Sequence, residues 1–83
     1  MRAEYAEQYK LLGIKIAMYR KMRGLTQEEL AEMVDLNVSF LGAVEAPGVS
    51  RTVSLDSLFD IAKALDVPAY KLLYNAILKI EYS

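Results

Sequence analysis

Two short helix signals stand close together in the middle of the chain, and few folds can accommodate both. Thr26 and Glu29 have the spacing of a capping box, in which each side chain accepts a hydrogen bond from the other residue's backbone N–H. Apolar residues follow at helical spacing at Leu30, Ala31 and Val34. The sequence therefore predicts a helix of about eight residues directly after Thr26.

A second short helix is predicted after a turn of three or four residues. Asn37 is a favourable N-cap residue, and Leu41 and Val44 lie on one helical face behind it. Pro47 disfavours helical geometry at the residue before it, so this helix is expected to end before residue 46. Two short helices joined by so tight a turn form a helix-turn-helix unit.

Three further helices are expected around this unit. The first spans about residues 3–23 and stops at Gly24, and its Gly13 either admits a closely packed helix or breaks the segment. The fourth is capped by Ser54, and the fifth begins near Pro68. The expected apolar stripe of the first helix is Tyr5, Tyr9, Leu12, Ile16, Tyr19 and Met22, and the buried face of the fourth is Leu55, Leu58, Ile61, Ala62 and Leu65.

The predicted fold class is all-α, a five-helix bundle in a single domain over residues 1–83. Its core is expected to span residues 12–73, with a C-terminal apolar extension over 74–83. Within this extension, residues 78–82 alternate apolar and charged side chains, which fits a short strand as well as a helix.

Composition argues against catalysis and metal binding. The chain has no Cys and no His, which excludes disulfides and removes the commonest general base and metal ligand. The acidic residues Glu28, Glu29 and Glu32 fit a solvated helix face better than a metal site, because a metal needs converging ligands from elsewhere. We therefore expect no enzyme activity, no metal and no cofactor.

Nothing in the sequence predicts a membrane or an exported location. No apolar run approaches the ~20 residues of a membrane span. Glu4 and Glu7 stand where a secretion signal would be basic and then apolar. The expected location is the cytoplasm, with no membrane partner.

The formal net charge of −1 hides an uneven distribution of charge. Residues 10–23 contain five basic side chains and no acid, whereas residues 28–35 contain four acids and no base. A partner experiences this local field rather than the total. The five basic residues are Lys10, Lys15, Arg20, Lys21 and Arg23.

The segment Leu-Thr-Gln-Glu-Glu-Leu-Ala-Glu-Met-Val, from Leu25 to Val34, resembles the phage-repressor and Cro-like (XRE-type) helix-turn-helix regulators. The similarity extends over roughly residues 12–73. It implies a lambda-repressor-like DNA-binding domain whose third helix enters the major groove of double-stranded DNA. It also implies a sequence-specific transcriptional regulator, expected to be a repressor, that binds a palindromic operator as a homodimer.

The resemblance further implies roles for individual residues. Gln27 corresponds to a phosphate-contacting glutamine at the start of the second helix, where backbone N–H groups favour an anion. Arg20 and Glu45 correspond to an ion pair between the first and third helices, and Arg51 lies in a loop that often touches the DNA backbone. The expected phosphate-binding set is Gln27, Lys15, Lys21, Arg23 and Arg51, with Lys10 nearby, and the base-facing set is Val38, Ser39, Gly42 and Ala43.

The base-facing set departs from the family pattern of Arg, Gln, Asn or Ser. None of its side chains can make a bidentate bond to guanine or adenine, and Lys and Arg are absent between Gly24 and Ser50. We therefore expect DNA binding that is weak per subunit and dependent on dimerisation and DNA shape. The alternative is a protein-interaction module of the same fold, antitoxin-like or regulator-binding, with a protein partner.

The C-terminal apolar extension is the expected dimer interface. Hydrophobic residues make up 54% of the chain, and so small a domain has little interior in which to bury them. A two-fold contact would bury the surplus, whereas in the alternative residues 74–83 fold back onto Tyr5 and Tyr9. The expected interface residues are Leu73, Tyr74, Ile77, Leu78, Ile80 and Tyr82.

Overall fold

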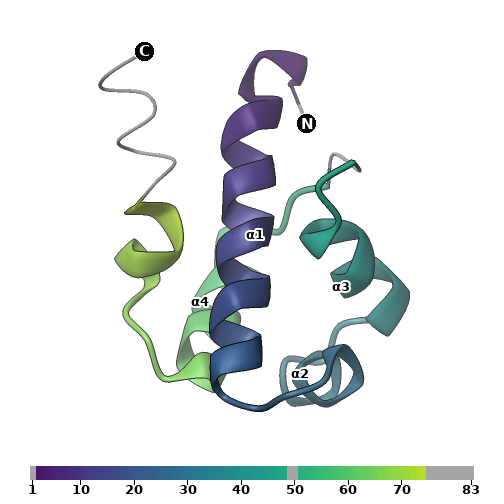
Figure 1. Cartoon of the computed structure of the whole chain (residues 1–83), viewed down its shortest axis with the longest axis vertical. Coiled ribbons are helices and arrows are strands. Elements are labelled where there is room, and N and C mark those ends of the chain that lie inside the picture. Colours follow the sequence, from purple (N-terminus) through teal and green to yellow (C-terminus); the bar gives the residue numbers. More distant parts are fainter. Residues whose placement is uncertain (1, 49–50, 75–83) are drawn as a thin grey trace.

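A computed structural model of the chain describes residues 2–48 and 51–74 (Figure 1). It contains a short 3-10 turn, η1 (Ala3–Tyr5), followed by the helices α1 (Ala6–Met22), α2 (Gln27–Met33), α3 (Val38–Glu45) and α4 (Leu55–Leu65). Residues 69–74 are again helical, and no strand occurs among the residues described. The predicted all-α class with five helices is confirmed. The choice between helix and strand for residues 78–82 falls outside the described residues.

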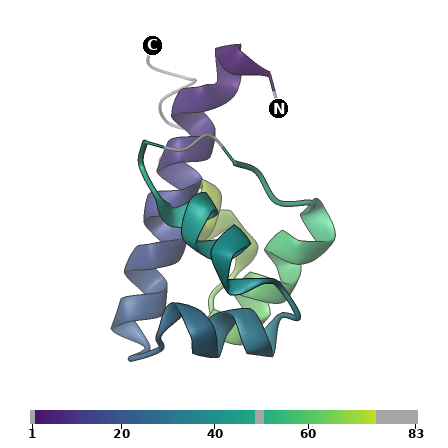
Figure 2. The same cartoon turned by 90° about the vertical axis from the view of Figure 1, so that its right-hand side faces the viewer.

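Helix α1 is the central element of the fold. Figure 1 shows α3 on one side of α1 and residues 69–74 on the other, and the turned view in Figure 2 shows α2 running beneath α3. Helices α1 and α2 each pack against both α3 and α4. Helix α3 of the helix-turn-helix unit is therefore held by α1, and α2 is held by α4.

The core receives large apolar side chains from every one of these helices. The fully buried side chains are Ile16 from α1, Leu30 from α2, Leu41 from α3, Ile61 and Leu65 from α4, and Leu72 from residues 69–74. Burying a side chain of this size stabilises a fold by about 1.5–3 kcal/mol. Leu72 lies within the range 12–73 expected for the core and is fully buried.

The three predicted N-caps are all present. The Thr26 hydroxyl accepts from the Glu29 backbone N–H at 3.0 Å, and the Glu29 carboxylate accepts from the Thr26 backbone N–H at 2.9 Å. The Asn37 side chain accepts from the backbone N–H of Ser39 at 2.8 Å. The Ser54 hydroxyl accepts from the backbone N–H of Ser57 at 3.1 Å. These caps determine where α2, α3 and α4 begin.

Gly13 allows α1 and α3 to pack with their backbones in contact. A Cβ atom added at Gly13 would overlap the carbonyl oxygen of Val44 in α3. Helix α1 runs through this position without a break. Of the two alternatives that the sequence left open for Gly13, close packing is therefore the one that the structure confirms.

Three residues expected on buried faces are exposed instead, namely Tyr5, Met22 and Leu55. Met22 lies six residues after Ile16, and at about 100° per residue this turns it about 120° away from the buried direction of α1. Tyr5 belongs to the 3-10 turn, whose different period does not continue the α-helical stripe. Leu55 is the first residue of α4 and lies beyond the edge of the core.

Candidate nucleic-acid interface

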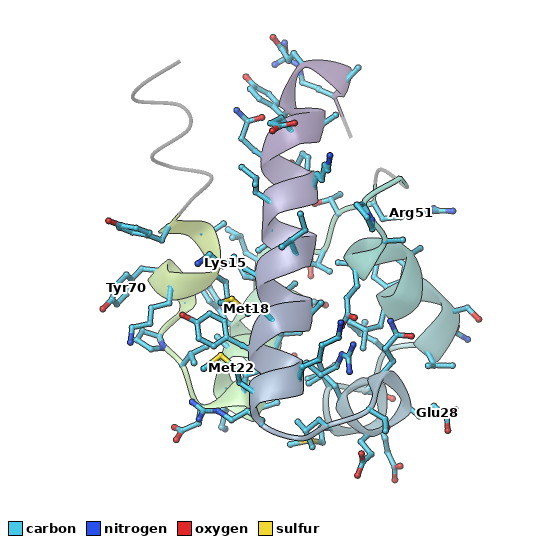
Figure 3. All side chains as sticks on the ribbon, viewed as in Figure 1. Lys15, Met18, Met22, Glu28, Arg51 and Tyr70 are labelled. Carbon is cyan, nitrogen blue, oxygen red and sulfur yellow. The ribbon has the colours of Figure 1, made fainter. Side chains whose placement is uncertain are left out.

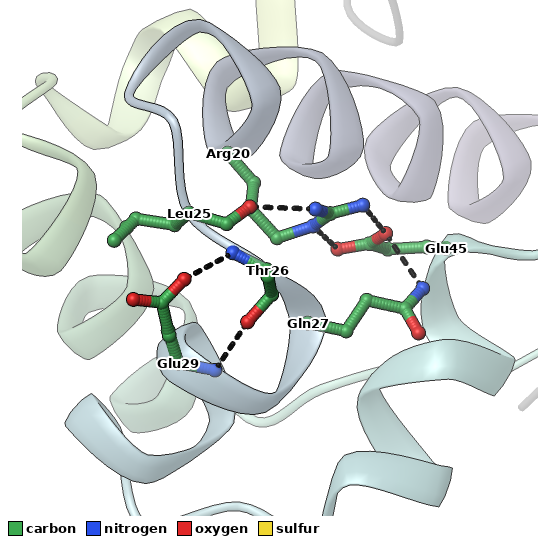
Figure 4. A network of polar contacts seen from close by, with 6 residues as sticks. All are labelled: Arg20, Leu25, Thr26, Gln27, Glu29 and Glu45. Carbon is green, nitrogen blue, oxygen red and sulfur yellow. Dashed lines mark hydrogen bonds and ion pairs between the residues drawn. The ribbon is translucent and has the colours of Figure 1, made fainter.

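A buried ion pair positions α3 against α1. The Arg20 guanidinium donates from Nε to Glu45 Oε2 at 2.8 Å and from Nη2 to Glu45 Oε1 at 2.9 Å (Figure 4). Its Nη1 donates to the Leu25 carbonyl oxygen at 2.8 Å. Arg20 and Glu45 are only 8% and 7% exposed. The bidentate geometry gives this contact directionality as well as charge attraction, and the ion pair implied by the resemblance is present.

The same contact shifts the protonation equilibrium of Arg20. Its hydrogen bond to Glu45 raises the pKa of the guanidinium above its ordinary value, although burial acts in the opposite direction. The raised pKa favours the charged form of Arg20, whose three hydrogen bonds to Glu45 and Leu25 hold α1 against α3 and the start of α2.

Gln27 joins α2 to this ion pair. It is the first residue of α2, and its Nε2 donates to Glu45 Oε1 at 3.0 Å (Figure 4). One carboxylate thus connects α1, α2 and α3. A glutamine amide has a second N–H and a carbonyl oxygen, so this bond leaves Gln27 with donor and acceptor capacity at the start of α2.

Gly42 lies where α3 passes the Gln27 side chain. A Cβ atom added at Gly42 would stand 3.4 Å from Gln27 Oε1, within ordinary van der Waals range. Gly42 therefore faces the junction between α2 and α3, at the edge of the expected base-facing set. The other members are Val38 and Ser39, which are exposed, and Ala43, which is half-buried.

The basic residues expected to bind phosphate are distributed over more than one face. Arg51 is exposed and extends outward beside α3 (Figure 3). Lys10 and Lys21 are exposed on α1. At about 100° per residue they lie about 60° and 80° around the helix from Gly13, which faces α3. Lys10, Lys21 and Arg51 therefore lie on or beside the α3 side of the molecule.

The structure places Arg23, one of the residues expected to bind phosphate, at the C-terminal end of α4. Its Nε donates to the Leu65 carbonyl oxygen at 2.6 Å and its Nη2 donates to the Asp66 carbonyl oxygen at 3.2 Å. The carbonyl groups at the end of a helix carry partial negative charge and attract cations. Arg23 therefore caps the C-terminal end of α4, an arrangement that depends on a contact between residues far apart in the sequence.

The structure does not place Lys15, another residue expected to bind phosphate, on the α3 side of the molecule. Lys15 lies on the side of α1 that faces residues 69–74, opposite α3 (Figure 3). It follows Gly13 by two residues, and this spacing turns it about 200° from the direction of α3. The basic residues of the segment 10–23 therefore lie on two different faces of α1.

The described residues give no sign of a metal centre or a membrane segment. Over residues 2–48 and 51–74, the structure brings together no group of three or more acidic side chains that could hold a metal ion. None of the helices in this part of the chain has the length and hydrophobicity needed to span a bilayer.

Five helices, a capped helix-turn-helix unit and an exposed third helix define a DNA-binding regulator of the helix-turn-helix class. A family model described as "Helix-turn-helix" matches residues 16–72, and the chain belongs to this family. The similarity to XRE-type regulators is thereby confirmed, and the chain is a DNA-binding transcriptional regulator.

Individual relatives support the same assignment. The control protein C.SmaI of Serratia marcescens is 38% identical over 72 residues, which cover 87% of this chain and 83% of that protein. The restriction-modification controller protein C.AhdI from Aeromonas hydrophila has a similar structure, with a TM-score of 0.70, 32% identity, and coverage of 86% of this chain and 98% of the other. The N-terminal DNA-binding domain of SinR from Bacillus subtilis is also similar, with a TM-score of 0.69 and 31% identity. The match covers 77% of this chain and 91% of the SinR domain.

Proposed function

We propose that this regulator binds a palindromic DNA operator as a homodimer in the cytoplasm and represses transcription from it. The observation that carries the proposal is the anchoring of α3: a single carboxylate, that of Glu45, holds α3 to α1 and α2 while Val38 and Ser39 remain exposed. A helix held rigidly at its inner face and open at its outer face fits the major groove.

The proposed contacts divide into two classes. Gln27, Lys10, Lys21 and Arg51 contact phosphates, and Gln27 does so with the N–H that Glu45 does not use. Val38, Ser39, Gly42 and Ala43 approach the bases. Val38 and Ala43 can touch thymine methyl groups, and Ser39 can make one adaptable hydrogen bond. Because these contacts distinguish only weakly between different base pairs, DNA shape supplies part of the sequence specificity.

The dimer is proposed to form through the C-terminal apolar segment. Tyr74 is exposed, and Leu73 is half-buried against the core. The other expected interface residues, Ile77, Leu78, Ile80 and Tyr82, lie outside the described residues, as does the alternative contact of residues 74–83 with Tyr5 and Tyr9. The similarity to C.SmaI and C.AhdI supports a controller role for this chain in a restriction-modification system.

Selection of bound sites from a random duplex library tests this function. We expect a palindromic consensus, and affinity for it that falls steeply with salt, with a slope of about −0.9 per phosphate contacted. Absence of any selected duplex at low salt would contradict DNA binding and favour a module that binds only protein. Light scattering on the chain without residues 74–83 tests the dimer, because a persistent dimer would refute the interface.

A further inference from the structure

A hollow between α1 and residues 69–74 lies on the opposite side of α1 from α3. It has a volume of about 260 Å³ and is lined by Lys15, Tyr19, Tyr70, Lys71 and Tyr74. We refer to these five residues as the tyrosine groove. Figure 3 shows Lys15 and Tyr70 on this side of the molecule, away from α3 and Arg51. The groove therefore remains accessible when α3 is occupied by DNA.

Exposed apolar side chains extend the groove into a larger patch. Tyr70 is 61% exposed and Tyr74 is 53% exposed, and they lie one helical turn apart. Met22 is 66% exposed, and Met18 lies one turn before it on the same side of α1 (Figure 3). Contiguous apolar surface of this kind marks a site of protein contact, and methionine adapts its shape to different partners.

The charge of the groove restricts what can bind there. Lys15 and Lys71 are its only charged residues, and neither forms an ion pair with any residue that the structure describes. A second copy that docked directly over Lys15 and Lys71 across a two-fold axis would bring these lysines toward their own counterparts, which is unfavourable. Carboxylates placed beside an apolar anchor complement this surface.

The size of the groove points to side chains rather than to a small-molecule ligand. Its volume of about 260 Å³ is below the ~300–1,000 Å³ of ligand pockets. A hollow of this size, open to solvent and lined by three tyrosines, accommodates one or two large apolar side chains. Tyrosine is also enriched at the centres of protein interfaces.

We propose that the tyrosine groove binds an acidic, amphipathic segment of a partner protein. Its apolar side chains pack against Tyr70 and Met18, and its carboxylates pair with Lys15 and Lys71. This surface gives the regulator a protein-binding site that is separate from its DNA-binding face. A partner can therefore act on the regulator while it occupies its operator.

A displayed library of random peptides, selected against the full chain, tests the proposal. We expect enriched peptides that combine large apolar residues with Asp and Glu. They should bind the Lys15→Glu/Lys71→Glu variant about tenfold more weakly, because two ion pairs become two repulsions. No enrichment, a consensus without acidic residues, or equal binding to this variant would each overturn the proposal.

Matched variants separate this site from the DNA-binding face. The Lys15→Glu/Lys71→Glu variant should retain its affinity for duplex DNA, whereas Lys21→Glu should lose duplex affinity and still bind the selected peptides. If Lys21→Glu loses the peptides as well, the peptides bind the DNA-binding face, and this result overturns the proposal.

The Tyr70→Ser variant tests whether the groove is instead a contact between copies of the chain. It should lose peptide binding without changing the mass measured by light scattering. A change from dimer to monomer would identify the groove as the contact between copies and overturn the proposal too.

Discussion

The amide nitrogen of Gln27 lies 3.0 Å from Glu45 Oε1, and this bond connects the start of α2 to the buried ion pair beneath it. Glu45 therefore serves two partners at once, because Arg20 binds the same carboxylate. Loss of the carboxylate would release α3 from α1 and would also free the Gln27 side chain at the start of α2.

Replacing Glu45 with Gln should destabilise the fold by about 3–5 kcal/mol, because the buried Arg20 charge loses its partner. Thermal melts followed by circular dichroism measure the effect, with Glu28→Gln on the exposed side of α2 as a control that stays within about 0.5 kcal/mol. The double variant Arg20→Met/Glu45→Leu should recover most of the loss, since no unpaired charge remains. A loss below about 1 kcal/mol for Glu45→Gln would contradict the buried pair.

The two helical glycines of the α1–α3 region should respond in opposite directions to the same substitution. Gly13→Ala should destabilise the fold by at least about 1–3 kcal/mol, because the added methyl group overlaps the Val44 backbone. Gly42→Ala should stabilise it by up to about 1 kcal/mol, because alanine favours the helix and its Cβ would stand 3.4 Å from Gln27 Oε1. Urea denaturation compares the pair, and equal effects would show that α1 and α3 are not in backbone contact.

Acid should weaken the cap of α2. The hydrogen bond from the Thr26 backbone N–H lowers the pKa of the Glu29 carboxyl below its ordinary value of 4.5. The cap therefore contributes fully above the unfolded-state pKa, and its contribution is lost as the pH falls through the lower folded-state pKa. Melting temperatures of the wild type and Glu29→Gln should converge as the pH is lowered toward 3. A difference that stays constant over this range would count against the cap.

Lys21→Ala should weaken binding to all duplexes alike and reduce the salt slope by about 0.9, because one phosphate contact is removed. Lys15→Ala should leave both affinity and slope unchanged, because Lys15 lies on the opposite side of α1. Fluorescence anisotropy at several salt concentrations makes the comparison. Arg23→Ala serves as a third variant, which should lower stability with no change in salt slope. An unchanged slope for Lys21→Ala would remove Lys21 from the interface.

The sequence predicts local features of this fold well because their cause is local. The caps at Thr26, Asn37 and Ser54 each depend on hydrogen bonds to residues two or three positions further on. The contacts of Arg23 could not be predicted in this way, because its partners, Leu65 and Asp66, come near it only when α1 and α4 pack together. No pattern within residues 10–23 carries that information.

The direction of Lys15 was difficult to predict for a different reason. A run of basic residues was taken as one surface, although a helix distributes successive residues around its axis. The face of α1 on which Lys15 lies follows from its angular position around the helix axis relative to Gly13. This reasoning requires knowing that Gly13 faces α3, which the sequence alone does not give. The tyrosine groove could not be foreseen in this way, because it forms between α1 and residues 69–74, and their relative placement depends on the burial of Leu72.

The absence of a side chain at residue 13 also limits how this regulator can acquire a new DNA target. Because α3 already rests on the main chain of α1 at Gly13, it cannot move inward, and any bulkier residue there would push it outward as a whole. The position of α3 against α1 is therefore fixed by the backbone contact at Gly13. If the proposed base contacts are correct, a new operator would require substitutions at Val38, Ser39 or Ala43 rather than a change in the position of α3.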